Sequence, residues 1–175
     1  MDMIYYHIDK DLTIKAQKTI SFDFYLSGLC SGKIFPSLSV HGVHYLVHDE
    51  KHEISRDYEL VLEYVRATLF PKYPSRFVCL FAHQDKNAAL SWANEYHKGK
   101  PFNLVTVESE QGYTFDASWI THPSSKNRLP IPRTSYIQYI ENVYRYWNGD
   151  RSDAPMLETL IPLPCKIVDV KPFSP

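Results

Sequence analysis

Glu158 stands out chemically in this sequence because it is a lone carboxylate at the start of a long apolar segment. The residues that follow it, Thr159-Leu160-Ile161-Pro162, are mostly apolar. Burying a carboxylate in such surroundings without a partner costs free energy, so its position needs a reason. One reason is chemistry, since a fixed carboxylate can stabilise positive charge in a site that excludes water. The alternative is that Glu158 only begins a strand at the protein surface.

Four histidines gather in one stretch of the chain: His41, His44, His48 and His52. Helical spacing would place several of them on one face, where they could hold a metal ion. Gly42, Val43 and Val47 argue against a helix there, and the stretch has neither a nearby cysteine nor an HExxH motif. We therefore expect ordinary surface or core positions for these histidines and no metal site.

Several common catalytic signatures are absent from the sequence. It contains no GxSxG motif, which marks the nucleophile of many serine hydrolases. With only six glycines, it also has no P-loop and no GxGxxG fingerprint to cradle a phosphate. These absences argue against a hydrolase of that type, a kinase and a Rossmann-type dehydrogenase.

The size and composition suit one folded domain over residues 1–175. The chain is 44% hydrophobic and 22% charged, which are ordinary values for a globular protein. A formal net charge of −1 gives no overall attraction to nucleic acid or to an anionic membrane. A local basic patch remains open, and its candidate members are Lys126, Arg128, Arg133 and Arg145.

The cysteines and the N-terminus bear on the cellular compartment. Cys30, Cys79 and Cys165 are odd in number and far apart, so we expect reduced thiols rather than a disulfide framework. The N-terminus lacks the basic start and apolar run of a signal peptide. No segment approaches the ~18 apolar residues that a membrane helix requires. These features predict a cytoplasmic protein with no membrane partner.

Short strands and a few helices follow one another in mixed order, which predicts an α+β domain. We expect strands over residues 3–8, 76–82, 103–108 and 113–119. A β segment over 158–170 should be interrupted by Pro162 and Pro164. We expect a helix ending near residue 69 with Ser55 or Asp57 as its cap, a second over 87–96, and a third after Thr134 that ends near residue 148.

Helical spacing of apolar residues predicts the buried faces of these helices. For the first helix, the predicted face comprises Leu60, Val61, Tyr64, Val65, Ala67, Thr68 and Leu69. For the second, it comprises Ala88, Ala89, Trp92, Ala93 and Tyr96. For the third, it comprises Ile137, Ile140, Tyr144 and Trp147.

The order of several short motifs resembles that of the ADP-ribosyltransferase superfamily. Tyr5-Tyr6-His7 is similar to the first motif in its histidine variant, and Glu158 with Lys166-Ile167-Val168 is similar to the third. Between them, Tyr73-Pro74-Ser75-Arg76-Phe77 and the following strand and helix resemble the middle motif. Phe115-Asp116-Ala117 and Tyr146-Trp147-Asn148-Gly149 resemble segments of a bacterial and phage branch.

This resemblance implies a split mixed or antiparallel β-sheet core with flanking helices, and NAD⁺ as the substrate. Glu158 would be the catalytic carboxylate, which stabilises the oxocarbenium-like ribose formed as nicotinamide departs. His7 would hydrogen-bond the dinucleotide, and Ser75 or Arg76 would hold ribose or phosphate. The aromatic residues assigned to stack on nicotinamide or pack beneath it are Tyr6, Phe77 and Phe81.

The implied activity is transfer of ADP-ribose to a macromolecular acceptor, either a protein or a nucleic acid. The resemblance implies a bacterial toxin, an effector or a phage-defence protein, with an antitoxin as a possible partner. The sequence departs from families that modify arginine, because Met156 stands where they carry Glu or Gln two positions before the catalytic glutamate. Two alternatives are open: an inactive protein of this fold that binds a nucleotide or a partner, and an unrelated α+β interaction module.

Overall fold

The structure is a computed structural model that describes residues 2–12, 14, 19–20, 39, 42, 53–121 and 136–174. The chain divides into two compact units. Unit 1 consists of Met1–Ser37, Leu80–Gly112 and Thr159–Pro175, and unit 2 of Leu38–Cys79 and Tyr113–Glu158. The described residues form a mixed α+β arrangement with two small antiparallel sheets, so the predicted α+β class is confirmed.

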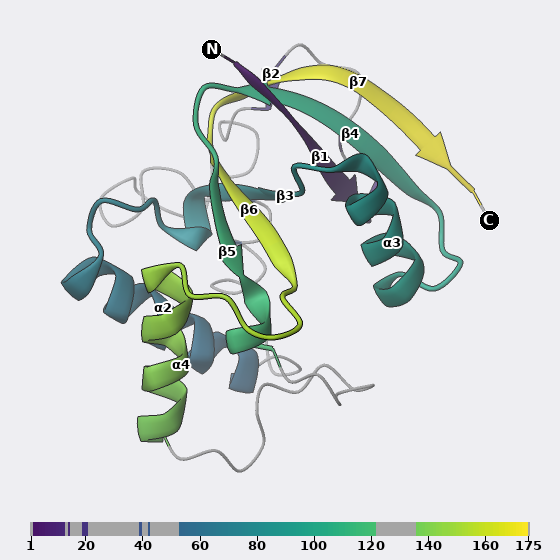
Figure 1. Ribbon diagram of the computed structural model, residues 1–175. Helices are drawn as coiled ribbons and strands as arrows, with labels where there is room; N and C mark the ends of the chain where they lie inside the picture. Colours follow the sequence, from purple (N-terminus) through teal and green to yellow (C-terminus); the bar gives the residue numbers. More distant parts are fainter. Residues whose placement is uncertain are drawn as a thin grey trace. The chain divides into compact units, whose positions relative to one another are not determined.

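The described helices and strands follow one another along the chain as labelled in Figure 1. They are β1 (Met3–Asp9), β2 (Thr19–Ile20), α2 (Glu53–Leu69), β3 (Cys79–Ala82), α3 (Lys86–Tyr96), β4 (Phe102–Ser109), β5 (Tyr113–Asp116), α4 (Tyr136–Asn148), β6 (Leu157–Pro162) and β7 (Cys165–Phe173). The first sheet has the order β1-β4-β7-β2, and the second has the order β3-β6-β5.

The first sheet is the centre of unit 1. Strand β1 runs antiparallel to β4, with His7 opposite Val105, and β4 runs antiparallel to β7. Side chains alternate between the two faces of a strand, so each face carries its own apolar cluster. One cluster includes Tyr5 and Val107, and the other includes Leu104. Helix α3 lies against the second face (Figure 1), which it covers with small buried alanines.

Helices α2 and α4 pack against each other in unit 2 (Figure 1). The indole Nε1–H of Trp147 donates a hydrogen bond to the backbone oxygen of Leu62 at 3.0 Å. The hydroxyl of Tyr139 donates to the backbone oxygen of Tyr58 at 3.1 Å. Both aromatic side chains are buried. Large α4 side chains therefore supply apolar area to the core while their polar atoms find partners on α2.

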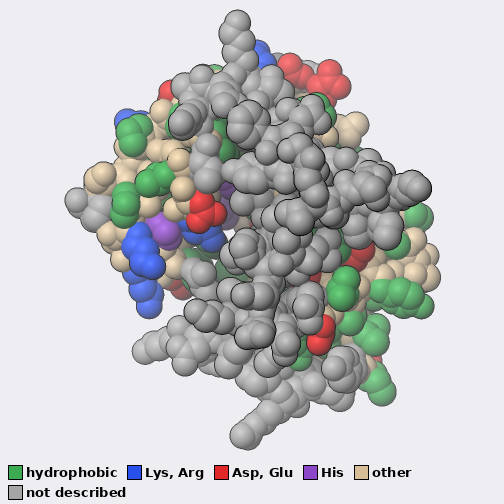
Figure 2. All heavy atoms as spheres, turned by 180° about the vertical axis from the view of Figure 1, so that it is seen from behind, with side chains coloured by type: hydrophobic (Ala, Val, Ile, Leu, Met, Phe, Trp, Pro, Cys, Tyr) green, Lys and Arg blue, Asp and Glu red, His purple; other side chains and the backbone are tan. Residues whose placement is uncertain are grey.

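The predicted inward faces of α2 and α4 are partly wrong. Eight residues predicted to be buried are exposed: Leu60, Tyr64, Ala67, Thr68, Leu69, Ile137, Ile140 and Tyr144. The buried positions are instead Glu59, Leu62 and Val65 on α2, and Tyr139, Val143, Tyr146 and Trp147 on α4. Both helices carry apolar residues around much of their circumference, so spacing alone allows more than one stripe. Hydrophobic side chains that reach the surface are green in Figure 2.

Smaller corrections concern the other predicted face and the first cap. Helix α2 begins at Glu53, so Ser55 and Asp57 lie inside it and neither is its cap. On α3, Ala88 is exposed, whereas Ala89 and Ala93 are buried as predicted. Asp85 caps α3, and its carboxylate accepts a hydrogen bond from the Ala88 backbone at 2.8 Å.

Two predicted strands are shorter than expected because each is joined to a 3₁₀ turn. Residues Arg76–Val78 form one such turn before β3, and Ala117–Trp119 form another after β5. Side chains promote both turns, since Ser75 and Asp116 accept hydrogen bonds from backbone N–H groups two residues ahead. The break predicted in the last β segment is confirmed, because β6 ends at Pro162 and β7 begins at Cys165.

One argument about the histidine stretch is wrong, because Gly42 has helical backbone. Its N–H donates to Ser39 Oγ at 2.9 Å, as in a helix N-cap. A Cβ at Gly42 would lie only 2.2 Å from the backbone oxygen of Phe77, so close approach explains the glycine. The four histidines, Cys30, Thr134 and residues 122–133 lie outside the described residues.

Two remaining expectations concern membranes and thiols. Within the described ranges, no helix combines the length and the apolar character needed to cross a bilayer. Cys79 and Cys165 are free thiols, and both are buried. Burial raises the pKa of each thiol to about 12. Both cysteines are therefore poor nucleophiles near neutral pH.

Candidate functional site

Glu158 is the second residue of β6 in unit 2, and its side chain is only 18% exposed. Its Oε1 atom accepts hydrogen bonds from Arg76 Nη1 and from the Tyr146 hydroxyl, the latter at 2.7 Å. One of these donors is a cation and the other is neutral. Glu158 is thus a partly buried carboxylate held by two side chains, rather than a solvated residue at a strand end.

Arg76 joins Glu158 to a second carboxylate. Its Nε and Nη2 atoms donate to the two oxygens of Glu59, each at 3.1 Å, in the forked geometry that a guanidinium favours. Its Nη1 atom also donates to the hydroxyl of Tyr146 at 2.7 Å. Arg76 and Glu59 are both buried. We call Glu59, Arg76, Tyr146 and Glu158 the carboxylate network.

Electrostatics within the carboxylate network keep Arg76 charged and Tyr146 protonated. Burial by itself lowers the pKa of Arg76, but Glu158 and Glu59 raise it well above its ordinary value. Burial raises the pKa of Glu59, and Arg76 opposes that shift. Burial also raises the pKa of Tyr146 well above its ordinary value, so the phenol keeps its proton. One cation therefore lies between two carboxyl groups in the network.

Aromatic packing fixes the Tyr146 ring. This side chain is fully buried, and its ring centroid lies 4.9 Å from that of Phe115 and 4.9 Å from that of Trp147. The Arg76 Cζ atom lies 5.4 Å from the centre of the same ring, within reach of a cation–π interaction. The phenol and the guanidinium therefore hold Glu158 from inside the unit 2 core.

Asp116 organises the segment that leads into β6. Its carboxylate accepts hydrogen bonds from the backbone N–H groups of Ser152 at 2.8 Å and Met156 at 2.9 Å. It also accepts one from Ser118 at 3.0 Å. Burial by itself raises the pKa of Asp116, but the hydrogen bonds from Ser152 and Ser118 lower it to about 2. An ionised Asp116 thus fixes the backbone two residues before Glu158.

His7 belongs to β1 in unit 1, where its Nδ1 atom lies 2.6 Å from the backbone oxygen of Phe81. A carbonyl oxygen only accepts hydrogen bonds, so Nδ1 carries the hydrogen and donates it. Burial lowers the pKa of His7. The neutral ring with Nε2 as a potential acceptor is consequently favoured.

The profile of one protein family, described as Protein of unknown function (DUF2441), matches residues 36–171. This range is well over half of the chain. The chain belongs to the DUF2441 family. Comparison with curated proteins finds no match. The DUF2441 match contains the whole carboxylate network, whereas Tyr6 and His7 precede it.

Within this DUF2441 chain, the predicted site residues fall into two groups. In unit 2, Arg76 contacts Glu158, while Ser75 caps the turn that contains Arg76 and the buried Phe77. In unit 1, His7 contacts Phe81. Tyr6, also in unit 1, pairs through its backbone with His83 and packs its half-buried side chain beside α3.

Sequence reasoning missed two members of the network, Glu59 and Tyr146. Tyr146 had been noted only as part of a motif, without a role. Glu59 carried a usable signal: it lies three residues before Leu62 and six before Val65, on the stripe of α2 that is buried. A charged residue within an apolar stripe of a helix calls for a buried partner.

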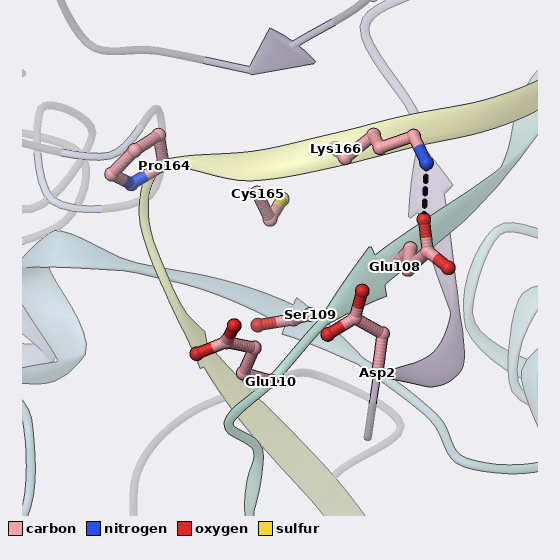
Figure 3. A pocket seen from close by; sticks show the side chains of 7 residues that line it. All are labelled: Asp2, Glu108, Ser109, Glu110, Pro164, Cys165 and Lys166. Carbon is pink, nitrogen blue, oxygen red and sulfur yellow. Dashed lines mark hydrogen bonds and ion pairs between the residues drawn. The ribbon is translucent and has the colours of Figure 1, made fainter.

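A pocket in unit 1 of the DUF2441 chain has different chemistry (Figure 3). Its lining residues are Asp2, Glu108, Ser109, Glu110, Pro164, Cys165 and Lys166. Lys166 is already paired with Glu108, as the dashed line in Figure 3 shows. This acidic lining without aromatic side chains is a poor match for an anionic dinucleotide. In the part of the chain that the structure describes, no three His, Cys, Asp or Glu side chains form a metal-binding group.

Proposed function

We propose that this DUF2441 protein is an ADP-ribosyltransferase that cleaves NAD⁺ and transfers ADP-ribose to a protein or nucleic acid. Two lines of support lead to this proposal. The first is the ordered set of motifs that resemble the ADP-ribosyltransferase superfamily. The second, which carries the proposal, is the partly exposed Glu158 carboxylate held by Arg76 and Tyr146.

The proposed reaction uses Glu158 to stabilise positive charge. As the bond between ribose C1′ and nicotinamide breaks, nicotinamide leaves with the bonding electron pair and C1′ becomes oxocarbenium-like. Glu158 accepts a hydrogen bond from a ribose hydroxyl and faces the developing charge. The acceptor nucleophile then forms a bond to C1′ and releases its proton to solvent.

The charge and rigidity of the carboxylate network suit this role. NAD⁺ carries its positive charge on the nicotinamide ring, and that charge moves to the ribose as the bond breaks. The partly exposed Glu158 carboxylate favours both states. Because Arg76 and Tyr146 already hold Glu158, the carboxylate needs little reorganisation during the reaction. Such preorganisation is the main source of electrostatic catalysis.

The test is to incubate the purified protein with adenylate-labelled NAD⁺ and a cell lysate, and to measure nicotinamide release and labelled macromolecules. We expect Glu158→Gln to lower both by about a hundredfold or more, as for loss of one preorganised electrostatic group. Glu63→Gln is the matched control, because Glu63 pairs with Arg66 in unit 2 and is not a member of the carboxylate network. Protease and nuclease digestion of the labelled product identify the acceptor class.

Two outcomes would overturn the proposal in different ways. Saturable NAD⁺ binding without nicotinamide release would support the inactive nucleotide-binding alternative. No binding of NAD⁺ would leave an α+β interaction module. Growth inhibition on expression that Glu158→Gln relieves would add support for a toxin, and co-expression of an antitoxin should then relieve it too.

A further inference from the structure

We propose that Tyr146 is a positioning residue that, together with Arg76, holds one oxygen of Glu158 and leaves the other for a ligand hydroxyl. This inference rests on the proposed function, in which that hydroxyl belongs to the ribose of NAD⁺. It extends that function by identifying the Glu158 oxygen that accepts the ribose hydroxyl and the side chain that orients the carboxylate.

The hydrogen bonds to Glu158 are concentrated on one oxygen. Arg76 Nη1 and the Tyr146 hydroxyl both donate to Oε1. Among residues 53–121 and 136–174 and the shorter described segments, none donates to Oε2. Two donors at one oxygen fix the rotation of the carboxylate. The second oxygen of this partly exposed side chain is then the acceptor offered to a ligand.

The direction of the Tyr146 hydrogen follows from its two partners. The guanidinium of Arg76 has only donors, so the Tyr146 oxygen must accept from Nη1 at 2.7 Å. The single hydroxyl hydrogen is then directed to Glu158 Oε1, also at 2.7 Å. The buried ring between Phe115 and Trp147 prevents the hydroxyl from swinging away.

Because Glu59 also holds Arg76, the hydrogen bond from Tyr146 to Glu158 can be removed without displacing Arg76. Glu59 binds Arg76 through Nε and Nη2, on the side of the guanidinium that Glu158 does not use. Loss of the Tyr146 hydroxyl should therefore leave Arg76 in place. Tyr146→Phe keeps the aromatic packing and removes only the directing hydrogen bond.

The first test compares Tyr146→Phe with Tyr139→Phe. Tyr139 is the matched control, because it lies on the same helix, is equally buried and donates its hydroxyl to Tyr58 instead of Glu158. We expect Tyr146→Phe to lower kcat for NAD⁺ cleavage about tenfold, as for loss of a hydrogen bond to a charged group. KM should change less than about twofold, because the substrate contacts remain. Tyr139→Phe should keep the kcat of the wild-type protein.

The second test repeats Tyr146→Phe in the Glu158→Gln background. A residue that acts through Glu158 has little further effect once that carboxylate is lost, so the double variant should match Glu158→Gln within about twofold. An equal loss of kcat in both backgrounds, or a rise in KM with kcat unchanged, would overturn the positioning role.

Failure of the proposed function is distinguishable from failure of this inference. If the wild-type protein releases no nicotinamide, the function is wrong, and the positioning is tested by urea unfolding alone. We then compare Tyr146→Phe, Glu158→Ala and the double variant with the wild-type protein. Non-additive losses of unfolding free energy support the hydrogen bond between the two side chains, whereas additive losses overturn it.

Discussion

Glu158 in unit 2 and His7 in unit 1 are both ionisable residues within motif-like segments. The surroundings of Glu158 stabilise a charged group, whereas those of His7 favour a neutral one. Glu158 meets a guanidinium and a phenol that donate to it. His7 donates to one backbone oxygen, and burial lowers its pKa. The difference shows that a protein interior keeps a charge where an opposite charge is buried with it, and otherwise favours the neutral form.

Arg76 is the residue on which the charged region depends. Its cation compensates two carboxylates at once, those of Glu59 and Glu158. By contrast, no carboxylate forms a hydrogen bond or ion pair with His7 among the described residues, where its partner is the Phe81 backbone oxygen. Three substitutions test whether the difference between the two environments has this cause.

The largest effect is expected for Arg76→Met. This change leaves Glu59 and Glu158 facing each other without their shared cation, and it should lower the unfolding free energy by about 3–5 kcal/mol. Urea denaturation at pH 7 measures the loss. Arg66→Met is the comparison, because Arg66 pairs with one carboxylate, Glu63, at a more exposed position. Equal losses of unfolding free energy in the two variants would contradict the view that Arg76 stabilises the fold more than Arg66 because it is buried with two carboxylates.

An intermediate effect is expected for His7→Asn, whose amide nitrogen can still donate to the Phe81 oxygen. The folded-state pKa of His7 lies below that of the unfolded chain, so the unfolded state takes up its proton first as the pH falls. The contribution of His7 to stability is thus constant above the unfolded pKa of about 6.5 and declines below it. Urea denaturation from pH 8 to pH 5 should show a smaller decline for His7→Asn. Identical pH dependence after normalisation at pH 8 would contradict the lowered pKa of His7.

The smallest effect is expected for Lys166→Met in unit 1. Lys166 forms an ion pair with Glu108, but its side chain is 69% exposed, so water competes with Glu108 for the ammonium group. The urea midpoint should match that of the wild-type protein within experimental error. A loss of stability comparable to that of Arg66→Met would mean that an ion pair contributes as much to stability when it is exposed as when it is partly buried.

Much of the secondary structure could be predicted from the sequence. The strand at residues 3–8 and the helix at 87–96 are confirmed with shifts of one residue at an end. The break after Pro162 is confirmed because proline cannot donate to a sheet ladder. These features depend on local chain chemistry, which the residue types express directly.

The buried faces of α2 and α4 could not be predicted in the same way. Leu60 and Tyr64 are as suitable for a core as Leu62 and Val65, yet the first pair is exposed and the second is buried. Which stripe faces inward depends on the partner helix and on the area that packing can bury. For the same reason Tyr146 and Glu59 were missed as partners of Arg76 and Glu158.

The residue types alone predict most of the described strands and helices in their order, the α+β class and a carboxylate at the start of an apolar strand. These follow from short-range preferences that each segment carries alone. The position of Arg76 between Glu59 and Glu158, and the hydrogen bond from the Tyr146 hydroxyl to one oxygen of Glu158, are visible only in the folded structure. The reason is that these side chains come from four separate segments of unit 2, and their contacts exist only after those segments have folded together.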